Sequence, residues 1–157
     1  MKNEITIVNM EPQLVIGMRK TGPYKNIGIM IPQICQYAVQ NGIQLIGPPI
    51  CVCRETSAEE AVKADKSGNA DIEVAVPIAQ RGKETDEIKC YELPAAKMAK
   101  IVHKGPYQEE TVTYQKLFDW LEENNKAITG PMREIYINNP HVVPQEELLI
   151  EIYAPVE

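Results

Sequence analysis

The stretch Gly22-Pro23-Tyr24 occurs a second time as Gly105-Pro106-Tyr107, at a shift of 83 residues (105 minus 22). The same shift relates three further pairs: Glu4-Ile5 with Glu87-Ile88, Asn41 with Asn124, and Gly47-Pro48 with Gly130-Pro131. A single Gly-Pro pair is common in turns and means little alone, but an ungapped register of several pairs is hard to obtain by chance. The sequence therefore predicts a tandem duplication. Two halves that merely share turn residues are the alternative.

The end of each half also matches, at a different shift. Residues 71–78 correspond to residues 149–156 at a shift of 78 (149 minus 71), so the first half has five extra residues in its last connection (83 minus 78). A chain of 157 residues has the usual length of one domain. We therefore predict a single domain over residues 1–157 with internal repeats 1–83 and 84–157.

Each repeat is predicted to begin with a strand and a helix. Residues 13–21 and 96–104 run apolar or alternate and end at Gly-Pro, which favours a strand closed by a turn. Apolar side chains then follow at helical spacing, and they are Ile31, Ile34, Cys35 and Ala38 in the first half and Tyr114, Leu117, Phe118 and Leu121 in the second. Because proline disrupts a helix interior, we expect the first helix to begin near Pro32. Asn41-Gly42 and Asn124-Asn125 are predicted helix ends.

Two more strands are predicted after each helix, at about 49–54 and 70–77 in the first half and about 132–138 and 148–154 in the second. Between the first two, Ser57-Ala58-Glu59-Glu60 has capping-box spacing and predicts a short helical turn, but the polar stretch up to Gly68-Asn69 is also consistent with a loop. Each half then has three strands and one helix. We predict an α+β fold of tandem β-α-β-β units with pseudo-twofold symmetry, in which an antiparallel sheet carries two main helices on one face and a cleft lies near the axis.

Composition excludes several classes of function. A formal net charge of -6 disfavours direct binding of nucleic acid. The sequence has no apolar run of about 20 residues, the length needed to cross a membrane, and it opens on an alternating strand pattern, so we expect a soluble cytoplasmic protein. The four cysteines, Cys35, Cys51, Cys53 and Cys90, lack zinc-ligand spacing and a C-x-x-C pair, and we interpret them as small buried hydrophobes. No metal and no cofactor are predicted.

One position differs sharply between the repeats. The residues that share a face of the predicted strand are Met132, Glu134 and Tyr136, and their first-half counterparts are Pro49, Cys51 and Cys53. If this face looks toward the helices, Glu134 is partly desolvated, which is costly unless a donor or a positive charge compensates. A cationic or hydrogen-bond-donating ligand would compensate for the desolvation of Glu134. Alternatively, the face points to solvent, or Arg133 or a lysine pairs with Glu134.

Aromatic residues are candidates for the walls of a binding site. Tyr37 and Trp120 are counterparts beside the apolar stripes, and Tyr24 and Tyr107 stand at the helix starts. Such rings stack on planar or cationic ligands, or they simply complete a core. Catalytic patterns are sparse, because the histidines His103 and His141 are far apart and the serines Ser57 and Ser67 have no adjacent base.

Several motifs together resemble the GyrI-like effector-binding family, which includes the effector-binding domains of AraC- and MerR-type transcription regulators and is built from tandem SHS2-like repeats. They are the repeated Gly-Pro-Tyr, Leu117-x-x-Trp120-Leu121, Gly130-Pro131 followed by Arg133-Glu134-x-Tyr136, and Glu151-Ile152-Tyr153-x-Pro155-Val156. The resemblance covers essentially the whole chain. It implies the tandem fold and a multidrug-type pocket between two helices, with a strand glutamate at its base. By position that glutamate is Glu134, with Tyr136, Tyr107 and Trp120 as walls.

The resemblance implies three functions. The first is a stand-alone module that senses or sequesters lipophilic, cationic or planar small molecules, with a DNA-binding regulator as a protein partner. The second is a hydrolase of reactive small molecules, in which Glu134, assisted by Tyr136, acts as general base. The third is a gyrase inhibitor whose acidic surface competes with DNA. We favour binding over catalysis, and we do not expect this chain to bind DNA or a membrane directly.

Overall fold

The computed structural model describes residues 4–55 and 57–157, and the repeat is visible in the order of its elements. The strands of this part of the chain are β1 (Thr6–Met10), β2 (Gln13–Gly22), β3 (Ile50–Cys53), β4 (Ala70–Pro77), β5 (Lys89–Leu93), β6 (Ala96–Lys104), β7 (Met132–Tyr136) and β8 (Leu149–Pro155). The helices are α1 (Ile27–Gln40), α2 (Ala58–Ser67) and α3 (Glu110–Glu123). Short 3-10 turns are η1 (Tyr24–Asn26), η2 (Tyr107–Glu109) and η3 (Gln145–Glu147). The α+β fold with tandem units is confirmed.

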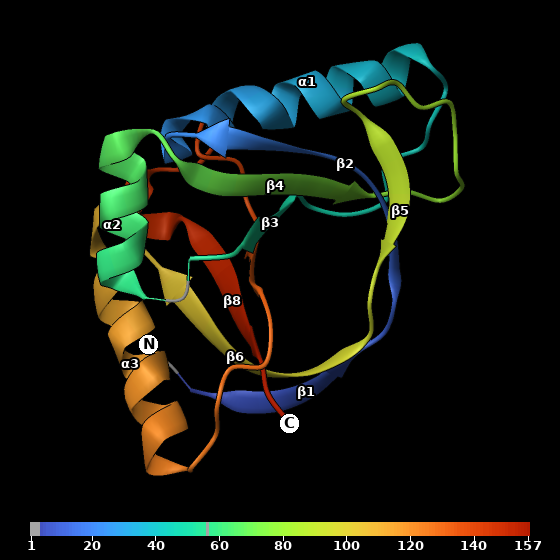
Figure 1. Ribbon diagram of the computed structural model, residues 1–157. Helices are drawn as coiled ribbons and strands as arrows, with labels where there is room; N and C mark the ends of the chain where they lie inside the picture. Colours follow the sequence, from blue (N-terminus) through green and yellow to red (C-terminus); the bar gives the residue numbers. More distant parts are fainter. Residues whose placement is uncertain (1–3, 56) are drawn as a thin grey trace.

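The strands form one antiparallel sheet that is nearly symmetric about its middle. Its order is β1-β6-β8-β7-β3-β4-β2-β5, and the sheet curls so that its two ends approach each other (Figure 1). The two halves meet where β3 pairs with β7, and there Cys51 lies opposite Glu134. These two residues are also counterparts in the repeat, so the pseudo-twofold axis passes between them.

Each repeat also contributes an outer strand to the other. The strand β1 pairs with β6 of the second repeat, and β5 pairs with β2 of the first. The expectation of three strands in each half is therefore low by one. These five-residue strands lie at the sheet edges, where few of their side chains are buried.

The two main helices start at matching positions, and the expected start near Pro32 is wrong. Helix α1 begins at Ile27, five residues earlier, with Pro32 inside it. Proline at this position removes the hydrogen bond to the carbonyl of Gly28. Both residues lie on the exposed side of the helix, where water can replace that bond.

Both predicted helix ends are confirmed, and they use the same chemistry. The side-chain amides of Asn41 and Asn124 donate to the carbonyls of Tyr37 and Trp120 at 2.9 and 2.8 Å. The following residues have left-handed backbone, with φ of 66° at Gly42 and 54° at Asn125.

The segment from Ser57 to Gly68 is a helix and not a loop. The hydroxyl of Ser57 accepts from the amide of Glu60 at 3.1 Å, as the capping-box pattern predicts. Helix α2 then runs for ten residues, and Gly68 ends it with φ of 69°. The predicted short helical turn is thus a complete helix of ten residues.

The helices lie on one face of the sheet, as expected. Ile34 and Ala38 of α1 pack with Ile16, Ile72 and Val74, while Leu117 and Leu121 of α3 pack with Ile101, Ile150 and Ile152. A third core, which includes Val15, Ile50, Val52 and Met98, fills the inside of the curl on the opposite face. None of the helices in the described residues is both long enough and apolar enough to traverse a bilayer.

Candidate ligand-binding site

Glu134 lies on β7 at the pseudo-twofold axis, on the face that the helices cover. Its neighbours across the sheet are Cys51 of β3 and Ile152 of β8. Alternation along the strand places Met132 and Tyr136 on the same face, and both belong to or pack against the core under α3. Glu134 is half-buried. The alternative in which this residue points to bulk solvent is therefore wrong.

Two tyrosine hydroxyls donate to the carboxylate of Glu134. Tyr136 donates to Oε1 at 3.0 Å, and Tyr114 of α3 donates to Oε2. Burial and the negative charge of Glu134 raise the pKa of both phenols, so each stays a donor at neutral pH. Hydrogen bonds to an ionised acceptor are among the stronger ones in proteins.

Glu134 has no cationic partner among the residues that the structure describes. Arg133 points to the opposite face of the sheet, because neighbouring residues in a strand alternate, and it donates to the carbonyl of Pro94 at 2.8 Å. The alternative pairing of Glu134 with Arg133 or a lysine is thus not what the structure contains. A half-buried negative charge therefore has neutral donors and no positively charged partner in this part of the chain.

Glu110, the first residue of α3, places a second carboxyl group beside Glu134. Burial, the charge of Glu134 and a hydrogen bond between the two carboxyl groups raise the pKa of Glu110 to about 10. Glu110 therefore keeps its proton at neutral pH and donates it toward Glu134. The pair is an acid beside a carboxylate and has one negative charge in total.

Tyr107 lies beside this pair, whereas its first-repeat counterpart Tyr24 has other partners. Burial, together with Glu110 and Glu134, raises the pKa of Tyr107, whose side chain is 41% exposed at the edge of the site. Tyr24, its counterpart, donates to Glu55, and its pKa is raised by burial first and, among weaker causes, by Cys53 and Cys51. We use the term tyrosine–glutamate cluster for Glu110, Glu134, Tyr107, Tyr114 and Tyr136.

Two cysteines of the first repeat, Cys51 and Cys53, lie beside the cluster on strand β3. The sulfur atoms of Cys51 and Cys53 lie 3.8 Å apart on the shared face of β3, as the spacing predicts. The contact with Cys51, followed by burial, raises the pKa of Cys53. Both residues are thiols that pack as small side chains, with Cys51 buried.

The two remaining aromatic candidates have other partners. Tyr37 lies toward the C-terminal end of α1, and its hydroxyl donates to the carbonyl of Lys83 at 2.5 Å. Trp120 lies toward the C-terminal end of α3 and packs against the core under that helix. The structure thus brings together Glu134, Tyr136 and Tyr107, while Tyr37 and Trp120 have contacts of their own.

Sequence reasoning missed Glu110 and treated Tyr114 only as part of an apolar stripe. At the shift of 83, their first-half counterparts are Ile27 and Ile31, both packed against the core of that half. The change from isoleucine to glutamate at the helix start is of the same kind as the change from cysteine to Glu134. Comparing the helix starts in the same register would have identified this residue.

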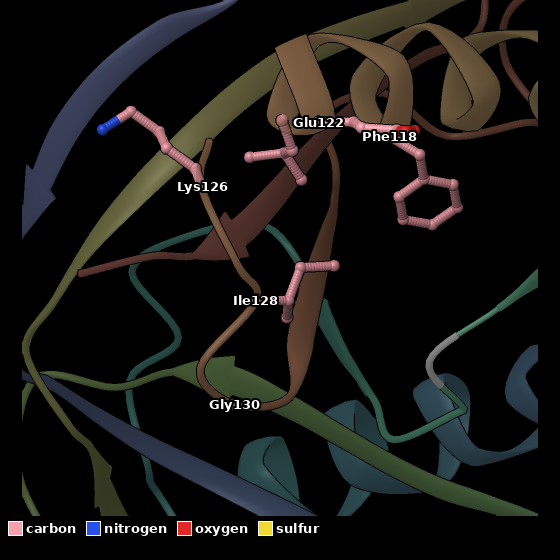
Figure 2. A pocket seen from close by; sticks show the side chains of 6 residues that line it. Phe118, Glu122, Lys126, Ile128 and Gly130 are labelled. Carbon is pink, nitrogen blue, oxygen red and sulfur yellow. The ribbon is translucent and has the colours of Figure 1, made fainter. Parts of the chain in front are cut away.

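A hollow of about 480 Å³ opens near the other end of α3. Its walls are formed by Phe118, Leu121, Glu122, Lys126, Ile128 and Gly130, and Figure 2 shows Phe118 on the helix and Ile128 on the segment opposite. The ring of Phe118 lies 5.9 Å from that of Tyr114, centroid to centroid, so one aromatic contact joins hollow and cluster. The negative charge lies at the cluster, whereas the hollow begins at Phe118, one helical turn after Tyr114 on α3.

This arrangement is suited to binding a cation. A carboxylate removed from water without a positive partner gains most from a ligand that supplies one, and phenol rings attract cations through their faces. The interaction is stronger here than in water because the effective dielectric constant is lower.

Several solved structures have the same fold. The C-terminal domain of EcmrR matches with a TM-score of 0.86 and 24% identity, covering 100% of this chain and 99% of that one. In the EcmrR–DNA complex the identity is 26% and the TM-score 0.82, over 98% of this chain and 57% of that one, so the present chain spans little more than half of that protein.

More distant matches share the fold alone. A hydrolase from Listeria innocua is 10% identical with a TM-score of 0.71, over 99% of this chain and 93% of that one. SAV2435, solved with tetraphenylphosphonium, is 11% identical with a TM-score of 0.60, over 98% and 94%. No curated protein matches the sequence.

The family whose sequence pattern matches is described as the GyrI-like small molecule binding domain, and it matches residues 3–157, almost the whole chain. The expected resemblance is thereby confirmed. The chain belongs to the GyrI-like family of small molecule binding domains.

Proposed function

We propose that this domain binds lipophilic cations of small size at the tyrosine–glutamate cluster. The observation that carries the proposal is Glu134, a half-buried carboxylate with hydroxyl donors and no cationic neighbour in the described part of the chain. An unpaired buried charge is costly, so it persists where it has a use. SAV2435, a protein of the same fold, is solved with a lipophilic cation, which supports this ligand class.

Within this proposal the residues have different roles. Glu134 pairs with the charge, Tyr136 and Tyr107 contact the ligand, and Tyr24 approaches it from the other repeat. Trp120 and Tyr37 lie farther along the helices, so they contact only a ligand large enough to extend between α1 and α3.

The domain over residues 1–157, with repeats 1–83 and 84–157, is proposed to act as one binding unit that senses or sequesters its ligand. The repeats meet at the Cys51–Glu134 pair, so strand β3 of the first repeat lies beside a cluster whose residues all come from the second. A separate DNA-binding regulator is the partner that this role favours. A cytoplasmic location stays a prediction.

The two alternatives have weaker support. A hydrolase would use Glu134 as base, with Tyr136 assisting, but both oxygens of Glu134 already accept hydrogen bonds from tyrosines, which a water molecule would have to displace. Gyrase inhibition rests on net acidity alone, a property that many proteins share. The family description favours small-molecule binding over both.

Equilibrium dialysis with crystal violet, a lipophilic triarylmethyl cation, tests the proposal. Removal of the charge in Glu134→Gln should weaken binding about 10-fold or more, because a charge-assisted contact contributes about 1.5–3 kcal/mol. Glu151→Gln is the matched control: Glu151 is also half-buried, but it lies on the opposite face, where Lys100 pairs with it at 3.2 Å. Equal affinity of Glu134→Gln and wild type would refute the role of the charge.

A further inference from the structure

We propose that Cys51 and Cys53 form a two-sulfur site for a thiophilic divalent cation of the zinc and cadmium class, beside the carboxylate of Glu134. The site takes a metal ion and not an organic molecule, so it lies beyond the proposed function and does not depend on it. Both sulfur ligands come from the first repeat, whereas the neighbouring charge comes from the second.

The distance between the two sulfur atoms is the spacing that one bridging ion requires. The sulfurs of Cys51 and Cys53 lie 3.8 Å apart. Two zinc–sulfur bonds of about 2.3 Å, set at the tetrahedral angle, place their sulfur atoms about 3.8 Å apart. A direct disulfide bond would instead bring the sulfurs to about 2.0 Å. The pair can therefore accept an ion with little change in this distance.

The end of strand β3 holds the two thiols together. Residues two apart in a strand point to the same face, and the sulfur of Cys53 also lies 3.9 Å from the carbonyl oxygen of Cys51, so the Cys53 side chain leans back along the strand. Cys51 is only 2% exposed, whereas Cys53, the last residue of β3, is half-buried. An ion can reach the pair from the side of Cys53.

Glu134 supplies a negative charge next to the two sulfurs. It lies opposite Cys51 in the ladder between β3 and β7, and the Cβ atoms of such pairs are about 4.5–5.5 Å apart. Arg54, the next residue after Cys53, points to the opposite face and pairs with Glu73 at 2.7 Å. An ion between the sulfurs therefore lies beside a carboxylate that has no cationic partner in the described chain.

A bound cation would also relieve a repulsion in the free protein. The contact with Cys51 first, then burial and the charge of Glu134 raise the pKa of Cys53, because a thiolate there would face other negative groups. Zinc and cadmium bind cysteine as the thiolate, and binding releases the thiol protons. The charges that oppose a free thiolate thus favour a thiolate pair with a cation between its sulfurs.

The number of protein ligands restricts the class of ion. Within residues 4–55 and 57–157, no group of three or more histidine, cysteine or acidic side chains is placed to hold a metal ion. The chain offers two sulfurs, and water completes the coordination. Hard cations such as magnesium and calcium need several oxygen ligands, whereas thiolates select soft or borderline ions.

Titration of the reduced domain with cadmium chloride tests the inference, because each bond between cadmium and a thiolate adds to the ultraviolet absorption. We expect one cadmium ion to bind with the absorption of two such bonds. The chain has two other cysteines, Cys35 and Cys90. Replacing both of these by serine leaves the proposed ligands as the only thiols, and the titration should be unchanged in that double variant.

Three single variants separate the ligands from the neighbouring charge. Cys53→Ser removes one sulfur at nearly constant size, and the cadmium affinity should fall about 100-fold or more, since loss of an outer partner alone costs about 10–100-fold. Glu134→Gln removes the adjacent charge, and the affinity should fall about 10-fold. Glu151→Gln, a half-buried glutamate on the opposite face, should leave it unchanged. Circular dichroism checks that each variant is folded.

The outcomes distinguish this inference from the proposed function. No thiolate absorption in wild type, its loss in the double variant of Cys35 and Cys90, or full cadmium affinity in Cys53→Ser overturns the inference. Full affinity in Glu134→Gln overturns the part assigned to the carboxylate. Crystal violet binding is measured without cadmium, so its failure in wild type overturns the proposed function alone.

Discussion

Replacing Glu110 by glutamine should make the domain more stable at neutral and alkaline pH. An ordinary glutamate loses its proton near pH 4.5, whereas the folded domain raises the pKa of Glu110 to about 10. Between these values the folded state holds a proton that the unfolded state has released. Folding then requires proton uptake, so the stability of the wild-type domain falls as pH rises through this range. Glutamine removes that requirement.

The magnitude follows from the linkage between protons and folding. Each pH unit inside the range changes the free energy of unfolding by about 1.4 kcal/mol for one proton. From pH 6 to pH 8 the wild-type domain should therefore lose about 2–3 kcal/mol relative to Glu110→Gln, on an order-of-magnitude basis. Such a difference is a large part of the stability of a domain of this size.

Urea unfolding at pH 6, 7 and 8 measures the effect directly, because the midpoint reports stability when the slope is unchanged. The quantity of interest is the difference between Glu110→Gln and wild type at each pH, in which all other titrating groups cancel. Glu109→Gln, an exposed neighbour at the same helix start, should show a difference that is constant with pH. A constant difference for Glu110→Gln as well would refute the protonated acid and the pair it forms with Glu134.

Other predictions concern single contacts. Tyr136→Phe removes the 3.0 Å hydrogen bond to Glu134 and should lower the free energy of unfolding by about 1–2 kcal/mol in urea titration; an unchanged midpoint would contradict the contact. Gly17→Ala brings a methyl group to 2.6 Å from the carbonyl of Val74 and should cost about 1–3 kcal/mol, visible as a lower Tm. In Gly28→Ala the new methyl group meets no atom within 4 Å on the exposed side of α1. Through helix propensity the change should raise the free energy of unfolding by about 0.5–1 kcal/mol, and the Tm with it; a lower Tm would contradict the open space.

Much of the fold could be predicted because the chain contains two copies of one unit, and the two copies can be compared with each other. The register at shift 83 located the strands and the helices of both halves, and the residues after each helix predicted its end at Asn41 and Asn124. The outer strands β1 and β5 were left out of the predicted units, although the N-terminal segment showed a strand pattern, because short edge strands bury few side chains. The start of α1 was misplaced because a proline on the exposed side of a helix costs less than one inside a core.

The site could be predicted only in part, for a physical reason. Glu134 stood out because it replaces a cysteine on a strand face that the sequence pattern identifies as shared. Glu110 did not, because an acidic residue in the first turn of a helix is ordinary and favourable. Its buried position depends on how α3 lies over β7. The spacing of residues along the helix does not predict tertiary packing of this kind. The roles of Trp120 and Tyr37 remain predictions.

The most direct test of the central claim is a crystal structure of the domain with crystal violet bound. The account predicts the dye at the pseudo-twofold axis, with its positive charge against Glu134. A dye found instead in the hollow between Phe118 and Ile128, with the contacts of Glu134 to Tyr114 and Tyr136 unchanged, would contradict it.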